Sequence, residues 1–198
     1  MNTRLGLLVL CQGLFMTNNV TFIAINGLVG FALAPVAWMA TLPVTGYVAG
    51  GALATGLVGR HQRQYGRQKT FMIGLVVAIL SAGACAWAAM TRDFWLLNLA
   101  TLAAGYYNAN GALYRFAAVE LVDEAHKEKA ISWVLAGGVM GAFAGPNLAS
   151  GARDALADAP FAGAYIALMG VGLLGLLALA AVTAAEAGLA VRRARLGG

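Results

Sequence analysis

Long apolar runs alternate along the chain with short polar or charged separators. The apolar runs cover about residues 5–32, 35–58, 70–90, 94–117, 130–149 and 161–185. Each run is close to or above the roughly 20 residues that a helix needs to cross a hydrocarbon core of about 30 Å. Because hydrocarbon offers the backbone no hydrogen-bond partner, such runs fold as helices, which satisfy their own backbone groups. The pattern predicts an all-α membrane protein, with a bundle of six transmembrane helices over residues 1–190.

The first apolar run has to be distinguished from a secretory signal. Its leading apolar core, Leu5–Leu10, is shorter than a usual signal h-region, and no A-x-A-like cleavage site follows it. We therefore expect this segment to be the start of a retained first helix.

Composition agrees with a surface that mostly faces lipid. Of the 198 residues, 61% are hydrophobic and only 11% are charged, whereas a soluble domain keeps about 25% of its residues charged. Cys11 and Cys85 lie in separate apolar runs and form no disulfide or metal-binding spacing, so we interpret them as packing residues. The lipid bilayer is thus the first partner that the sequence predicts.

Basic residues indicate how the six runs are oriented. If consecutive runs cross in opposite directions, eleven of the thirteen basic residues fall on one side: Arg4, Arg60, Arg63, Arg67, Lys69, Arg115, Lys127, Lys129, Arg192, Arg193 and Arg195. Only Arg92 and Arg153 fall on the other side. The positive-inside rule then places both termini in the cytoplasm, with a basic cytoplasmic tail at 191–198. Because the charge is distributed as a topology signal, the net charge of +5 does not indicate nucleic-acid binding.

Polar side chains within the membrane are concentrated in the first and fourth runs. Gln12, Asn19 and Asn26 are seven residues apart and therefore share a helix face. In the fourth run, further amides, small residues and tyrosines recur every three or four residues and so share one side of a helix. Such stripes face a cavity or other helices rather than acyl chains. The candidate substrate-binding residues are Asn19, Asn26, Asn108, Asn110, Gln12 and Tyr107.

Two explanations of these stripes remain open. The amides could act as interhelical glue, at about 0.6 kcal/mol each. The alternative is a solute site, because packing alone gives no reason to favour the first and fourth runs. These two runs are equivalent if the six helices form a 3+3 repeat, and secondary transporters often place substrate sites at the interface of such repeats.

Small residues predict where helices approach closely. Gly46, Gly50 and Ala54 are four residues apart in the second run. Gly137, Gly141 and Gly145 have the same spacing in the fifth run. The proline that follows Gly145 is expected to end or kink that helix, because it cannot donate a backbone hydrogen bond.

The segment 59–69, GRHQRQYGRQK, resembles the signature loop of the major facilitator superfamily, whose pattern is roughly Gly-x-x-x-Asp-Arg-x-Gly-Arg-Arg/Lys. Gly59, Gly66 and Arg67 match this pattern, and Arg63 stands where the family usually has its aspartate. The resemblance implies a cytoplasmic gating loop formed by Gly59, Arg63, Gly66, Arg67 and Arg115. Glu120 or Asp123 would be the acidic partner of this gate. The alternative is that these arginines serve only as topology signals and headgroup contacts.

Other stretches are similar to a bacterial branch of this superfamily that includes copper importers and riboflavin transporters. They are residues 114–118, 131–138 and 145–149, and the similarity extends over about residues 5–180. The resemblance implies alternating access between two six-helix bundles in the inner membrane, of which this chain matches the N-terminal one. A second six-helix half or a homodimer is then the expected partner, unless the chain is a truncated form.

The leading hypothesis is a component of a secondary transporter for a small solute that the sequence does not identify. The alternative is a non-transporting accessory subunit packed against a larger membrane complex. An enzyme is not expected, because the sequence has no metal-ligand spacing, nucleophile–base pair or phosphate loop. No cofactor or metal site is predicted, and His61 and His126 are assigned to cytoplasmic loops.

Overall fold

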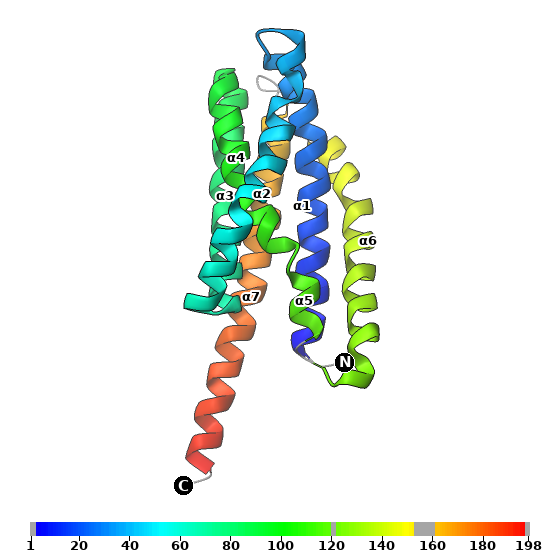
Figure 1. The fold of residues 1–198 in the computed structure, drawn as a ribbon, viewed down its shortest axis with the longest axis vertical. Coiled ribbons are helices and arrows are strands. Elements are labelled where there is room, and N and C mark those ends of the chain that lie inside the picture. Colours follow the sequence, from blue (N-terminus) through cyan, green and yellow to red (C-terminus); the bar gives the residue numbers. More distant parts are fainter. Residues whose placement is uncertain (1–2, 120–121, 153–160, 197–198) are drawn as a thin grey trace.

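The computed structural model of the protein describes residues 3–119, 122–152 and 161–196, and these residues form helices joined by short turns. The longer helices lie side by side along the long axis of the molecule (Figure 1). The elements are α1 (Thr3–Leu33), η1 (Ala37–Thr41), α2 (Leu42–Tyr65), α3 (Arg67–Thr91), α4 (Phe94–Gly111), α5 (Tyr114–Val119), η2 (Glu124–His126), α6 (Lys127–Ala152) and α7 (Ala162–Leu196). The prediction of an all-α architecture is confirmed for the described residues.

Five helical segments are long and apolar enough to cross a membrane. They are Leu5–Leu33, Ala37–Tyr65, Arg67–Thr91, Glu124–Ala152 and Ala162–Ala181. The fourth predicted run, 94–117, is not among them; the helix in its first part, α4, is 18 residues long and contains three asparagines and two tyrosines. Five of the six predicted crossings thus have a helix of suitable length and composition, and the count of six stays a prediction.

The fourth run also differs from expectation because it is divided into α4 and α5. The amide of Leu113 donates to the carbonyl of Asn110 at 3.0 Å, a tighter turn than an α-helix allows. At this turn Gly111 lies against the ring of Phe15, and a side chain at Gly111 would overlap that ring. Beyond the turn, α5 packs against α1 and α6, whereas α4 packs against α2 and α3 (Figure 1).

The segment 59–69 was expected to be a loop, but it is helical on both sides of Gly66. α2 continues to Tyr65 and α3 begins at Arg67, so Gly66 alone separates the two helices. Gly66 has φ +82° and ψ 161°, a conformation that is essentially limited to glycine. Arg60 and Arg63 therefore project from the last turns of α2, where they are exposed.

The two glycines of this segment should respond differently to alanine. Gly66→Ala is expected to lower the free energy of unfolding by about 1–3 kcal/mol, because φ is positive there. Gly59→Ala is the matched control: Gly59 is helical, has open space around it, and alanine is the better helix former. Thermal unfolding of the purified variants in detergent measures both effects. Equal stability of the two variants would contradict the argument.

Helices pack in pairs through glycine faces, as the four-residue spacing predicts. α1 packs most extensively on α6, α2 on α4, and α3 on α7. A side chain at Gly141 of α6 would overlap the carbonyl of Gly13 in α1. A side chain at Gly50 of α2 would likewise overlap the carbonyl of Leu102 in α4, and one at Gly105 would overlap the backbone of Gly50. Close backbone approach is thus confirmed in both pairs.

The proline of α6 does not end that helix. α6 continues through Pro146 to Ala152. Threonines of α1 hydrogen-bond to α6 on its glycine face: Thr17 Oγ1 donates to the carbonyl of Gly141 at 3.0 Å, and Thr21 Oγ1 donates to that of Gly145 at 2.8 Å. These bonds connect the helices without any buried charge.

Candidate functional site

Amide side chains of α1 and α4 meet a phenol of α2 in the middle of the bundle. Asn19 Nδ2 donates one hydrogen bond to the hydroxyl of Tyr47 at 2.9 Å and another to Asn108 Oδ1 at 3.1 Å. Asn19 and Asn108 are partly buried, whereas Tyr47 is 1% exposed. We refer to these three residues as the Asn19–Tyr47–Asn108 cluster.

Packing around the cluster explains why these side chains meet. A Cβ atom at Gly51 of α2 would lie 2.9 Å from Asn108 Nδ2, so a side chain there would displace the amide from its present position. The ring of Phe22, one turn after Asn19 on α1, lies 4.9 Å from the ring of Tyr47 and holds it. The α2–α4 glycine contact thus determines how close the amide of Asn108 comes to α1.

The amides of Asn26 and Asn110 lie elsewhere. Asn26 is fully buried between α1 and α7, where its Oδ1 accepts a hydrogen bond of 2.6 Å from the hydroxyl of Tyr165. Asn110 is fully buried against Gly74 of α3, and its Nδ2 donates to the carbonyl of Tyr106 at 3.0 Å. Neither amide is hydrogen-bonded to the cluster, and both are fully buried.

The two weaker candidates are also packing residues in this arrangement. Gln12 is 9% exposed and lies against Gly138 of α6. Tyr107 is 2% exposed, with its ring 5.4 Å from that of Phe15. Of the six residues predicted to bind substrate, the structure therefore brings only Asn19 and Asn108 into contact. Their role in binding stays a prediction.

The predicted gating residues are not brought together as Asn19 and Asn108 are. Arg63 is exposed on α2, and Arg115 is exposed on α5, with its guanidinium carbon 5.2 Å from the centre of the neighbouring Phe116 ring. Asp123 is exposed before η2, and Glu120 lies outside the described residues. Gly59 is helical, and Gly66 and Arg67 make the turn into α3. A charged gate therefore remains an expectation.

Sequence reasoning overlooked Tyr47 and assigned His61 to the wrong kind of element. Tyr47 had no polar neighbour to mark it, although it lies one residue after Gly46 and four before Gly51 on the α4-facing side of α2. His61, expected in a loop, is on α2, and its Nδ1 is 2.8 Å from the hydroxyl of Tyr106. In both contacts a tyrosine directly follows a glycine of a packed helix face: Tyr47 follows Gly46, and Tyr106 follows Gly105. This spacing is the signal that could have indicated the contacts.

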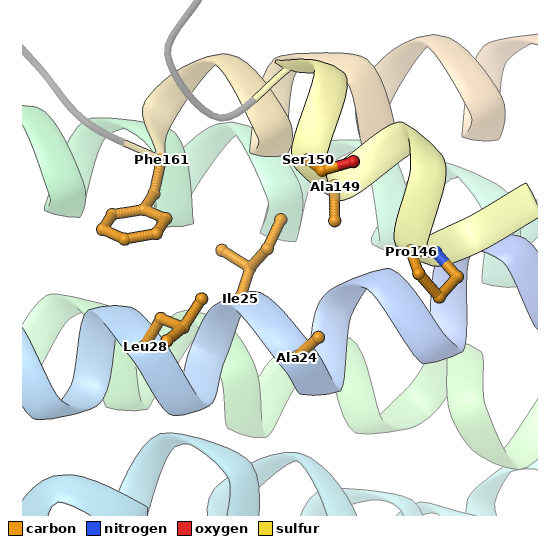
Figure 2. Close-up of a pocket in the computed structure, with 7 residues that line it drawn as sticks. All are labelled: Ala24, Ile25, Leu28, Pro146, Ala149, Ser150 and Phe161. Atoms are coloured by element: carbon orange, nitrogen blue, oxygen red, sulfur yellow. The ribbon is translucent and has the colours of Figure 1, made fainter.

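A separate apolar pocket lies between α1, α6 and the start of α7. Its volume is about 210 Å³ (Figure 2). The lining residues are Ala24, Ile25, Leu28, Pro146, Ala149, Ser150 and Phe161. None of the predicted site residues lines it, and its walls offer a solute almost no polar contact, so it is not the candidate site.

Comparison with known proteins shows that the chain is similar to membrane transporters. It is 35% identical over 170 residues to the riboflavin transporter RfnT of Brucella anthropi, covering 86% of this chain and 43% of that protein. It is 29% identical over 110 residues to the uncharacterized MFS-type transporter YddS of Bacillus subtilis, covering 56% of this chain and 25% of that protein. This chain is a relative of major facilitator superfamily transporters.

The chain spans less than half the length of the curated facilitator relatives that it matches. No family model and no solved structure matches it. The two relatives confirm the resemblance to major facilitator superfamily transporters that the sequence suggested.

Proposed function

We propose that this chain is one six-helix half of a facilitator-type secondary transporter that moves a small solute across the bacterial inner membrane. The Asn19–Tyr47–Asn108 cluster is the observation that carries the proposal. Asn19 lies midway along the apolar segment Leu5–Leu33, so the cluster is near the middle of the bilayer, where secondary transporters bind their solutes. Amides at that depth are unfavourable next to acyl chains and suit a polar cavity.

The helix pairing supports the 3+3 repeat that this function requires. In a repeat of three helices, α1 corresponds to α4 (with α5), α2 to α6, and α3 to α7. The α1–α6 pair then corresponds to the α4–α2 pair, and these are the two most extensive contacts of the bundle. Each has a glycine–glycine approach, Gly13 with Gly141 and Gly105 with Gly50. The third main pair joins α3 and α7, which are the last helices of the two repeats. Exchanging the repeats therefore exchanges these two helices and leaves the pair unchanged.

Charge supports the cytoplasmic location of both ends of the chain. The start of α1, the α2–α3 turn, the start of α6 and the end of α7 lie at the same end of the bundle (Figure 1). This end has the basic residues Arg60, Arg63, Lys127 and Lys129. The positive-inside rule assigns such an end to the cytoplasm.

Alternating access needs a second bundle that moves against this one. A second six-helix half, or a second copy of the chain, is the proposed partner. Riboflavin is the first solute to test, because the relative covering most of this chain is named a riboflavin transporter. Copurification of a respiratory or other large membrane complex, with no uptake, would favour the accessory-subunit alternative.

Uptake by cells or vesicles containing the chain and its partner tests the proposal. Asn19→Ala and Asn108→Ala should each lower the rate of riboflavin uptake by about tenfold, since a lost hydrogen bond to a polar group costs roughly 1–3 kcal/mol. Asn147→Ala is the matched control, because the Asn147 amide bonds only to its own helix, at the carbonyl of Phe143. Normal uptake in both cluster variants would refute the assignment of the site.

A further inference from the structure

The hydrogen bonds within the Asn19–Tyr47–Asn108 cluster determine which polar atoms are left to bind a solute. A carboxamide has two N–H donors and one carbonyl acceptor. Asn19 uses both N–H groups, one on Tyr47 and one on Asn108 Oδ1. Among the described residues, no hydrogen bond uses Asn19 Oδ1 or Asn108 Nδ2. Neither is a fully buried atom.

The resulting pattern is one vacant carbonyl and one vacant amino group, on two amides that are hydrogen-bonded to each other. It does not depend on the rotation of the amides, because an amide–amide bond always consumes one donor and one acceptor. Rotating both side chains by 180° leaves the amino group of Asn19 and the carbonyl of Asn108 instead. In either arrangement the pair presents a donor and an acceptor together.

We infer that the cluster selects solutes that have an N–H group directly beside a carbonyl, as in a ring lactam or imide. Such an edge donates to the vacant carbonyl and accepts from the vacant amino group at the same time. Ionised carboxylates and phosphates lack the donor of this paired edge, and the cluster itself has no cation to hold an anion. The inference rests on the proposed function, and it specifies the chemical class of solute for the same site.

Tyr47 is a positioning residue in this arrangement. Its hydroxyl accepts one N–H of Asn19, and its ring is buried against Phe22, out of reach of a solute. Removing the hydroxyl leaves that N–H without its acceptor, so the amide of Asn19 is no longer held in one orientation. Selectivity for the paired edge, rather than binding in general, should then fall.

Binding of matched pairs of probes to the purified chain, with any copurifying partner, tests the inference. Riboflavin has an imide edge, and N3-methylriboflavin has lost only the imide N–H. We expect N-methylation to weaken binding about tenfold or more, because a site that hydrogen-bonds an N–H rejects an analogue lacking it. Lumiflavin and 1-methyluracil, in which N3–H is the one ring N–H, extend the comparison to other imides together with their N3-methyl derivatives.

The outcomes separate this inference from the proposed function. Equal binding of riboflavin and N3-methylriboflavin would overturn the inference while a riboflavin transporter remained possible. If riboflavin does not bind but another imide binds and loses affinity on N-methylation, the inference stands and the proposed solute is wrong. Failure of every imide probe to bind would overturn the inference.

Two variants add a readout that a purely structural role would not change. Tyr47→Phe should reduce the affinity ratio between parent and N-methylated probe to about half of the native value or less. Asn108→Asp, which replaces the vacant amino group by an oxygen, should weaken binding of the parent imide about tenfold. Asn147→Asp is the control and should leave both the affinity and the ratio unchanged.

Discussion

Gly141→Ala is expected to destabilise the bundle more than any other single methyl addition in α6. The new methyl group would overlap the carbonyl of Gly13, which belongs to the backbone of α1 and cannot rotate away. Relief requires the two helices to separate, which also strains the hydrogen bond from Thr17 to the carbonyl of Gly141. Overpacking of this kind costs about 3 kcal/mol, which for a chain of this length lowers the melting temperature by roughly 6–12 °C.

The same helix offers the control. Gly151 lies on α6 with nothing near its Cβ position, so Gly151→Ala should leave the melting temperature unchanged or slightly raise it. On α2, Gly50→Ala should behave like Gly141→Ala, and Gly56→Ala like the control. Thermal unfolding in detergent, followed by size-exclusion chromatography, measures all four variants. If the two buried-glycine variants are as stable as their controls, the helices do not approach as described.

These glycine contacts are the part of the fold that the sequence predicted best. The reason is that a spacing of four residues places side chains on one helix face whatever the neighbouring helix is. Gly46, Gly50, Gly137 and Gly141 could therefore be assigned to close packing before any partner was known. The partner helices, and the pairing of α1 with α6 and of α2 with α4, depend on tertiary contacts that no local pattern contains.

The break between α4 and α5 could not be predicted for the same reason. The turn at 112–113 has no proline, and its glycine, Gly111, is ordinary within an apolar run. The break coincides with the Phe15 ring of α1, nearly a hundred positions earlier in the chain, lying against Gly111. The error at 59–69 is the opposite one, because a loop was expected there and the segment is mostly helical. Polar residues at the end of a membrane helix can continue the helix into water.

The candidate site was predicted in part. The stripes of amides directed attention to the first and fourth runs, and Asn19 and Asn108 from these runs are hydrogen-bonded to each other. However, successive residues of a stripe lie two turns apart along the helix, so they face different neighbouring helices. Asn19 faces α2 and α4, whereas Asn26, seven residues later, faces Tyr165 of α7. Periodicity identifies the polar side of a helix and leaves the contacts of each residue undetermined.

Tyr165→Phe is therefore expected to destabilise the chain through Asn26. Both residues are fully buried, and the phenol is the partner of Asn26 Oδ1 at 2.6 Å. Asn26 Nδ2 already has no hydrogen-bond partner among the described residues. Removing the hydroxyl leaves the whole amide unsatisfied in a dry interior, at a cost of about 1–3 kcal/mol. Tyr65→Phe, at the exposed end of α2, is the matched control for loss of a phenol hydroxyl.

A double variant distinguishes a structural amide from one that binds the solute. Asn26→Leu combined with Tyr165→Phe removes both polar partners, so it should recover most of the stability lost in Tyr165→Phe alone. If Asn26 acts as interhelical glue, the double variant should also retain uptake, whereas Asn19→Ala should not. Loss of uptake in a double variant of native stability would instead place Asn26 in contact with the solute, as the seven-residue stripe predicted. Melting temperature and initial uptake rate, measured on the same preparations, decide between these two roles.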